Sequence, residues 1–303
     1  MTLPALVWML LATVWGSTWL FIKIGLEDLP PFTFAALRFV VALMPLVLWM
    51  VVRRVRLPRS RADWWLMIVT GLLTFTMNYS LVFWGESHIS SGLAAILYTT
   101  FPLQGLVLAH VLLPEEPMTL GKVAGVAIAA AGVVLIFYNQ VELRGLLAFA
   151  GAGALVVAAF GTALADVLIK RQGVHIEPVT MTAVQMGVGV IPMLALGLLA
   201  EGNPLRFHWT GRAVFSLLYL AFVGSALTFV LLYWLIQRMQ VTRTMLIPLW
   251  STLIAVLLGA AVLGERLGWR VLAGAGGILV GLVVAVRAGP GGRAGSPAAS
   301  GRV

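Results

Sequence analysis

The chain has 303 residues, 61% of them hydrophobic and only 10% charged, whereas soluble domains carry about 25% charged residues, so a polytopic helical membrane protein is predicted. Lys and Arg outnumber Asp and Glu by 20 to 11, but the basic residues cluster in short loops, which indicates contact with the lipid bilayer and not with nucleic acid. The absence of cysteine excludes disulfides, thiolate metal sites and cysteine nucleophiles.

Hydrophobic segments follow one another along the chain, each close to the roughly 20 residues that cross a bilayer. Short connections rich in Pro, Gly and Ser separate them. The first segment is too long for a signal peptide and lacks a basic start, so we expect it to be retained as a helix. The predicted spans cover residues 4–25, 31–52, 64–85, 92–113, 119–138, 145–170, 178–200, 212–236, 242–263 and 268–287.

The middle of the first span combines small, polar and aromatic residues. Gly16 lets a neighbouring backbone or a ligand come close, while Ser17 and Thr18 carry hydroxyl groups. Trp15 and Trp19 are four residues apart and therefore share one helical face. Tight helix packing and the wall of a cavity both fit this pattern.

Arg38 lies about two turns below the outer end of the second span. A charge at this depth is costly, so its side chain should face a partner or a cavity. A structural charge pair or a cap on backbone carbonyls is one interpretation. The other is an anchor for a substrate carboxylate, which the guanidinium can hold through two parallel hydrogen bonds.

Polar and aromatic residues of the other spans converge near the same depth. We expect them to line one moderately polar cavity with aromatic walls near the bilayer midplane. Pro102 and Pro248 free backbone carbonyls and allow bends there, so we expect these prolines to act in gating. The predicted substrate-binding residues are Trp15, Ser17, Arg38, Asn78, Tyr79, Tyr98, Thr100, Phe160 and Trp250.

Asp166 is the acidic residue that lies well inside a predicted span, about one turn from its inner end. Lys170 follows at i+4, so a salt bridge between the two at the helix end is one interpretation. Proton coupling is the other, because carboxylates within membranes often serve as proton relays.

The basic residues also predict the topology. If the N-terminus is cytoplasmic, thirteen Lys and Arg residues fall on the inside and six on the outside, with the loop 53–61 as the strongest anchor. Both termini are therefore predicted to be cytoplasmic. Residues 288–303 are rich in Gly, Ala, Pro and Ser and are expected to form a disordered tail.

Shifting the chain by 147 to 150 residues matches a series of residues in order, which indicates an internal repeat. Residues 1–140 would form the first copy and residues 141–287 the second. Each copy has five spans, an odd number, so the copies cross the membrane in opposite senses, as in many secondary transporters. The matched pairs include Lys23 with Lys170, Pro31 with Pro178, Arg38 with Gln185, Trp84 with Trp234, and Glu116 with Glu265.

Several of these motifs resemble the drug/metabolite transporter superfamily in its EamA-type branch. They are Trp15-Gly16-Ser17 followed by Lys23, residues 35–39 around Arg38, Pro102 followed by Glu116-Pro-Met-Thr119, and residues 264–267. The resemblance implies an all-α membrane protein with ten transmembrane helices, in two inverted five-helix repeats around a central cavity. It also implies movement of small metabolites, commonly export.

Within that family the sequence looks most like bacterial exporters of aromatic and other neutral amino acids. The expected function is therefore an inner-membrane amino-acid exporter that works by alternating access, as a monomer or weak homodimer. The alternatives are a multidrug or other metabolite efflux carrier, an intramembrane enzyme and a scaffold. The sequence shows no phosphate-binding loop, nucleophile elbow or His-Glu metal pair, so we expect no enzyme activity, cofactor or metal.

Overall fold

The computed structural model describes residues 2–86, 88–89, 97–136, 145–263 and 268–288, and within these ranges the chain forms only helices and turns. The predicted boundary between the repeats at residue 140, Glu265 with its motif, and the predicted tail beyond residue 288 lie outside the described residues. We call the described residues up to 136 the first half and those from 145 onward the second half.

The first half begins with two long helices, each with proline in its first turn, where a missing N–H costs no intrahelical bond. Its third span is interrupted by a π-helical segment, η1. The helices are α1 (Leu3–Leu26), α2 (Pro31–Val52), α3 (Arg61–Gly71), η1 (Leu72–Met77), α4 (Asn78–Glu86), α6 (Thr100–Leu112) and α7 (Leu120–Ile136).

Side chains fix several helix starts in the second half. The Glu177 carboxylate accepts a hydrogen bond from the Thr180 N–H at 2.8 Å, and the Thr210 hydroxyl accepts one from the Ala213 N–H at 3.1 Å. The elements are α8 (Leu146–Gln172), α9 (Pro178–Ala200), η3 (Pro204–Arg206), α10 (Gly211–Ala221), η4 (Phe222–Leu227, π-helical), α11 (Thr228–Arg238), α12 (Val241–Thr244), α13 (Ile247–Leu263) and α14 (Trp269–Arg287).

Seven described segments are long and apolar enough to cross a membrane, so the chain is a multi-pass membrane protein. They are α1, α2, the α3–η1–α4 segment, α8, α9, the α10–η4–α11 segment and α14. The other three predicted spans correspond to the shorter helices α6, α7 and α13.

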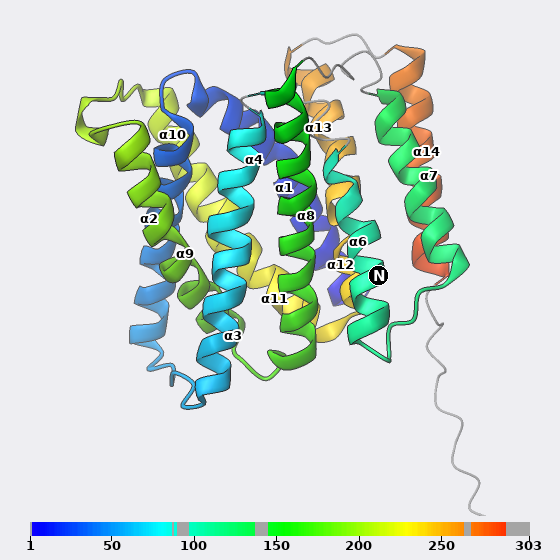
Figure 1. Ribbon diagram of the computed structural model, residues 1–303, viewed down its shortest axis with the longest axis horizontal. Helices are drawn as coiled ribbons and strands as arrows, with labels where there is room; N and C mark the ends of the chain where they lie inside the picture. Colours follow the sequence, from blue (N-terminus) through cyan, green and yellow to red (C-terminus); the bar gives the residue numbers. More distant parts are fainter. Residues whose placement is uncertain (1, 87, 90–96, 137–144, 264–267, 289–303) are drawn as a thin grey trace, which may run out of the picture.

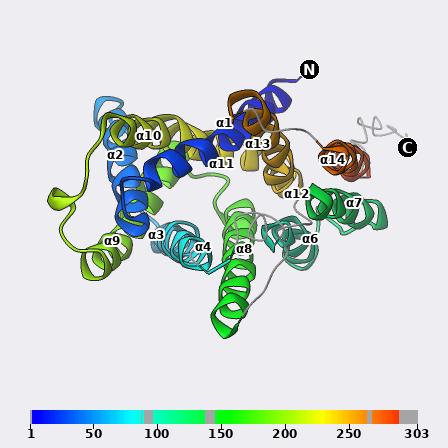
Figure 2. The same cartoon turned by 90° about the horizontal axis from the view of Figure 1, so that it is seen from above.

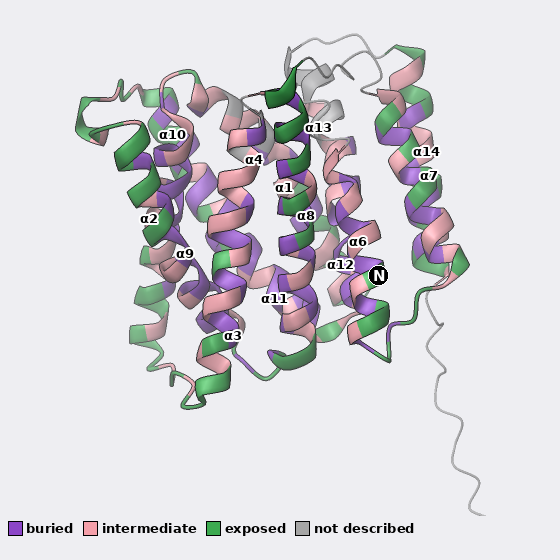
Figure 3. Ribbon diagram, viewed as in Figure 1, coloured by how far each residue is buried: buried purple, intermediate pink, exposed green. Residues whose placement is uncertain are grey.

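The helices stand in two rows (Figures 1 and 2). One row holds α10, α11, α1 and α13, and the other holds α3, α4, α8 and α6. The pair α2 and α9 closes one end of the rows, and the pair α7 and α14 closes the other. The main apolar core combines buried residues from both rows and from α2 and α9. The end helices α2, α9, α7 and α14 also carry many exposed apolar residues (Figure 3).

The helix contacts come in matched pairs when the two halves are exchanged. Helix α1 packs on α13, α10 and α11, while α8 packs on α6, α3 and α4. Segment η4 packs on α2, while η1 packs on α9. The two π-helical segments begin and end 150 residues apart, the same offset that matches the sequences of these spans.

Glycines allow α7 and α14 to approach closely. A Cβ atom at Gly132 would lie 2.5 Å from the carbonyl oxygen of Gly274, and one at Gly125 would lie 2.6 Å from that of Gly281. Small residues at this spacing let two helix backbones touch, which is a common way to join helices in membranes.

Candidate functional site

Two π-helical segments, η1 and η4, interrupt the α3–α4 and α10–α11 spans and pack on α9 and α2. In η4 the Ser225 hydroxyl donates to the carbonyl of Leu220, five residues earlier, at 2.7 Å, which fits the wider winding. Single π-helical turns inside α-helices are rare and occur frequently at functional sites. The sequence did not predict these segments.

Arg38 on α2 is a buried charged residue next to η4, with 3% of its surface exposed. Its Nε donates to the Ser225 hydroxyl at 3.2 Å, and its Nη2 to the Tyr79 hydroxyl at 3.4 Å. The guanidinium carbon also lies 4.7 Å from the centre of the Phe39 ring and 5.2 Å from that of Tyr79. Among the described residues Arg38 forms no salt bridge and donates to no backbone carbonyl. These residues therefore supply neither the charge partner nor the carbonyls that a purely structural role of Arg38 would require.

A series of aromatic contacts connects the rings beside Arg38 to residues of both halves. Phe39 packs against Phe75 with ring centres 5.0 Å apart, and Phe75 against Phe229 at 4.7 Å. Trp15 meets Phe229 at 5.8 Å, and its indole N–H donates to the Thr228 hydroxyl at 3.2 Å. We call Trp15, Arg38, Phe39, Phe75, Tyr79, Ser225 and Phe229 the Arg38 cluster. It brings together three of the predicted site residues, Trp15, Arg38 and Tyr79.

A second polar group borders this cluster, because Asn78 precedes Tyr79 on α4. The Tyr98 hydroxyl donates to the Asn78 side-chain oxygen at 3.0 Å, and the Tyr98 ring stacks on Phe101 at 5.9 Å. Thr100 donates to the carbonyl of Leu97 at 2.7 Å, so this hydroxyl serves its own helix start. Besides Arg38 and Tyr79, Asn78 and Tyr98 are thus a second pair of predicted residues whose side chains meet.

The structure does not bring the remaining predicted residues to the Arg38 cluster. Phe160 is 46% exposed, and Ser17 bonds to Tyr219, with 2.6 Å between the hydroxyl oxygens. Trp250 packs against Trp8 with ring centres 6.3 Å apart. Position along a helix predicts depth, but the rotation of the helix decides which side chains face inward.

Pro102 and Pro248 lie in the first turns of α6 and α13. A proline there removes no intrahelical hydrogen bond, so both mark helix starts and not kinks within a continuous helix. The helical path is interrupted just before each proline. The interruption lies at Thr99 before α6 and at Met245–Leu246 before α13.

Asp166 on α8 is 3% exposed, and its carboxyl group has no hydrogen bond or salt bridge among the described residues. Lys170 does not pair with it. The Lys170 ammonium donates to the carbonyls of Ile236 at 2.7 Å and Met239 at 2.8 Å, at the C-terminal end of α11. A cation there satisfies carbonyls that the helix leaves unpaired.

Two buried or half-buried carboxylates bind helix starts in the opposite half. Glu116 accepts from the N–H groups of Val241 at 2.7 Å and Thr242 at 3.1 Å, at the start of α12. Glu201 accepts from those of Phe32 at 2.8 Å and Thr33 at 2.7 Å, in the first turn of α2. Each carboxylate satisfies N–H groups that the helix leaves free.

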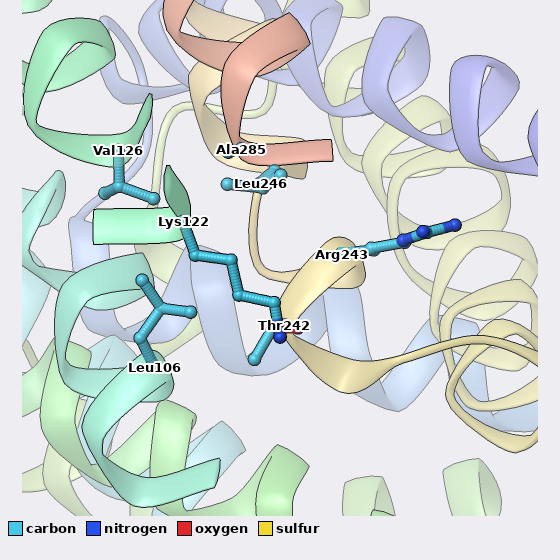
Figure 4. A pocket seen from close by; sticks show the side chains of 7 residues that line it. All are labelled: Leu106, Lys122, Val126, Thr242, Arg243, Leu246 and Ala285. Atoms are coloured by element: carbon cyan, nitrogen blue, oxygen red, sulfur yellow. The ribbon is translucent and has the colours of Figure 1, made fainter. Parts of the chain in front are cut away.

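A small, partly open hollow of about 10 Å³ lies between α6, α7, α12 and α14 (Figure 4). The Lys122 ammonium, which borders it, donates to the Pro117 carbonyl at 3.1 Å. None of the predicted substrate-binding residues lines this hollow. Its lining residues are Leu106, Lys122, Val126, Thr242, Arg243, Leu246 and Ala285.

Asp28, in the loop between α1 and α2, joins that loop to the residues before α10. Its carboxylate accepts a hydrogen bond from the Thr210 hydroxyl, and His208 Nδ1 lies 3.5 Å from it. The Thr210 hydrogen bond is the largest cause that lowers the pKa of Asp28 below its ordinary value, with smaller contributions from His208 and Arg212.

The fold and this interior define a multi-pass helical membrane protein with a buried cation and aromatic rings between its two halves. The family model described as the EamA-like transporter family matches residues 3–138 and again residues 149–287. The chain belongs to the EamA-like transporter family, and its class is therefore a metabolite transporter.

Relatives support this class. The chain is 27% identical to the uncharacterized transporter YoaV of Bacillus subtilis, over 86% of this chain and 89% of the relative. It is also 27% identical to a probable amino-acid metabolite efflux pump of Salmonella typhimurium, over 92% and 93%. A solved crystal structure superposes with a TM-score of 0.80 at 17% identity, covering 94% of this chain and 97% of the other, and supports the fold alone.

Proposed function

We propose that the protein is a secondary transporter that exports amino acids by alternating access around the Arg38 cluster. The observation that carries the proposal is the guanidinium of Arg38, which is buried and bound only by hydroxyls and rings among the described residues. A buried cation without a carboxylate is costly, and a substrate carboxylate would relieve that cost. The efflux pump among the relatives supports the same substrate class.

The substrate carboxylate would replace the hydroxyls of Ser225 and Tyr79 on the guanidinium. Its side chain would pack against Trp15 and the rings of Phe75 and Phe229, which favours aromatic and other neutral amino acids. Asn78 and Tyr98 would supply polar contacts beside it, since unpaired polar groups are expensive in a dry interior. We propose that the substrate contacts Thr100, Ser17, Trp250 and Phe160 only after the helices move, because these residues lie outside the Arg38 cluster.

We further propose ten transmembrane helices in two inverted repeats, 1–140 and 141–287. Three observations support this architecture: the equal offset of the two π-helical segments, the matched helix contacts, and the two successive matches of the family model. Rocking of one half against the other would then expose the cluster to each side in turn. The breaks before Pro102 and Pro248 are the proposed gating points.

We also propose that the protein lies in a bacterial inner membrane with both termini in the cytoplasm. The excess of basic residues in the loop 53–61 supports this orientation. A reporter fused after Val303 should then report cytoplasm, and one inserted at Gly202 should report the outside. The transporter would need no cofactor, catalyse no reaction and bind no nucleic acid. It would work as a monomer or weak homodimer.

Counterflow tests the proposed function. The purified protein is reconstituted into liposomes of phosphatidylethanolamine and phosphatidylglycerol, which are loaded with one unlabelled amino acid at a time. Transient accumulation of the same labelled amino acid, strongest for aromatic and neutral ones and absent from protein-free liposomes, is the expected result. No counterflow for any amino acid, with counterflow of a lipophilic cation such as tetraphenylphosphonium, would contradict the proposal and favour drug efflux.

A further inference from the structure

Asp166 is the buried charge that the proposed carboxylate site does not use. It lies on α8, six residues before the helix ends, and its carboxyl group has no bonded partner among the described residues. Lys170, one turn further, is occupied by the carbonyls of Ile236 and Met239. An ionisable group left unpaired inside a membrane is expensive to keep and is a functional site by default.

Two tyrosines, Tyr98 and Tyr233, lie within electrostatic range of this carboxyl group. Thr162, one turn before Asp166, borders the Tyr98 hydroxyl. The Tyr233 hydroxyl is buried and has no hydrogen-bond partner within the described part of the chain. A buried donor without a partner thus lies within electrostatic range of the Asp166 carboxyl group, so a movement of the helices could join the two by a hydrogen bond.

The same tyrosines lead towards Arg38. Tyr79 interacts electrostatically with both Tyr98 and Tyr233, and it accepts a hydrogen bond from Arg38. The buried acid and the buried cation therefore stand at two ends of one group of three tyrosines. In an interior of low dielectric constant, a charge at one end changes the energy of a charge at the other.

Other titratable side chains from the helices packed on α8 lie near helix ends and have partners or exposure of their own. Asp63 meets His175 at 3.0 Å, His110 accepts from the Met118 N–H, and Arg238 donates to the Trp234 carbonyl. Glu116, near Lys170, is held by α12. The remaining described basic residues on these helices are Arg61, Arg171 and Arg243.

We propose that Asp166 is a proton-binding residue that couples amino-acid export to proton entry. Its carboxylate takes up one proton from the outer side and becomes a neutral carboxylic acid, and it releases that proton to the cytoplasm after the protein changes conformation. The proton and the substrate's ammonium group compete for the negative charge of Asp166. Protonation from outside therefore promotes release of the substrate, and this inference rests on the proposed function.

Liposomes loaded with an acidic buffer and the fluorescent pH indicator pyranine test the coupling. Labelled L-phenylalanine is added outside at higher pH, and uptake is compared with counterflow at equal pH on both sides. For the unmodified protein we expect the gradient to raise uptake several-fold and the interior to become more alkaline as phenylalanine enters.

The variant Asp166→Asn should lose the stimulation, so that the ratio of uptake with and without the gradient falls to about one, and Asp166→Glu should restore part of it. Asp63→Asn, which removes an acid in the first turn of α3 that bonds to His175, is the control and should keep the ratio. Counterflow without proton movement in the unmodified protein would overturn the inference. This measurement does not depend on whether Asp166→Asn folds. Stimulation that survives in Asp166→Asn would overturn it as well. No counterflow at all would refute the proposed function first and this inference with it.

Discussion

Arg38 Nε donates to the hydroxyl of Ser225, 3.2 Å away, and so joins α2 of the first half to the π-helical segment of the second. Ser225 in turn donates to the carbonyl of Leu220, so its hydroxyl is fixed within the wider helical turn. The buried cation thus depends on both halves. Any movement between the halves must break or remake this contact, which is the physical basis of the proposed coupling between binding and conformation.

The close approach of α7 and α14 predicts a specific sensitivity to side-chain volume. Gly132→Ala places a Cβ atom 2.5 Å from the carbonyl oxygen of Gly274, so the helices must separate. We expect a loss of about 1–3 kcal/mol in stability, as for other overpacked contacts. Gly276→Ala on the same α14 is the control, because its Cβ atom meets nothing within 4 Å. Equal thermal stability of the two variants in detergent would contradict the packing.

Glu116→Gln tests the contact between the halves at the start of α12. The amide keeps one acceptor oxygen where the carboxylate had two, so Val241 or Thr242 loses its partner. We expect a cost of about 1–3 kcal/mol, the range for a buried polar group left unpaired. Glu115→Gln alters an exposed neighbour and should change little. Thermal unfolding of both variants measures the difference, and a Glu116→Gln protein as stable as the unmodified one would exclude the role.

The gating proposal predicts that Pro102→Ala and Pro248→Ala slow transport but leave the fold intact. Alanine supplies an N–H and lets the helix continue backwards across the break, which stiffens it. A barrier raised by roughly 1.4 kcal/mol would lower the flux about tenfold. Pro58→Ala, in the loop before α3, serves as the control. Unchanged counterflow rates in both variants would mean that these breaks are static.

Asp28 predicts a pH dependence of stability. Its pKa is lower in the folded protein than in the unfolded chain, so its contribution is fully present above the ordinary carboxyl pKa and is lost as the pH falls through the lowered value. Unfolding temperatures should therefore fall between about pH 5 and pH 3, and Asp28→Asn should flatten this part of the curve. Glu27→Gln is the adjacent control. Parallel curves for Asp28→Asn and the unmodified protein would show that the loop contact contributes nothing.

The sequence predicted much of the fold because membrane spans are set by length and hydropathy. Seven predicted spans coincide with long apolar helices. Arg38 contacts Tyr79, and Trp15 joins the same cluster through Phe229. Phe160 shows a limit of prediction from sequence, because its position along the span gives its depth in the membrane but not the rotation of the helix. Its neighbours Ala158 and Ala159 are buried, whereas Phe160 is exposed. Likewise i+4 spacing suggested a pair of Asp166 and Lys170, but the free carbonyls of α11 compete for the ammonium.

Sequence reasoning missed Phe39, Phe75 and Phe229 in the cluster. The repeat carried a usable signal, because the shift of 150 residues matches Tyr79 with Phe229 and Phe75 with Ser225. Residues matched across a two-fold relation lie near each other when they lie near its axis. The π-helical segments had no such signal, since their winding depends on tertiary contacts and not on local residue preference.

The central claim is that Arg38 binds the substrate carboxylate. The most direct measurement is counterflow of labelled L-phenylalanine in liposomes, with unlabelled L-phenylalanine or L-phenylalaninamide as competitor, for the unmodified protein and for Arg38→Gln. A charge-assisted hydrogen bond contributes about 1.5–3 kcal/mol, so the account predicts a half-saturation concentration roughly 10- to 100-fold higher in Arg38→Gln. It also predicts that the acid competes far better than the amide only when Arg38 is present. Unchanged half-saturation in a correctly folded Arg38→Gln protein, or equal competition by acid and amide in the unmodified protein, would contradict it.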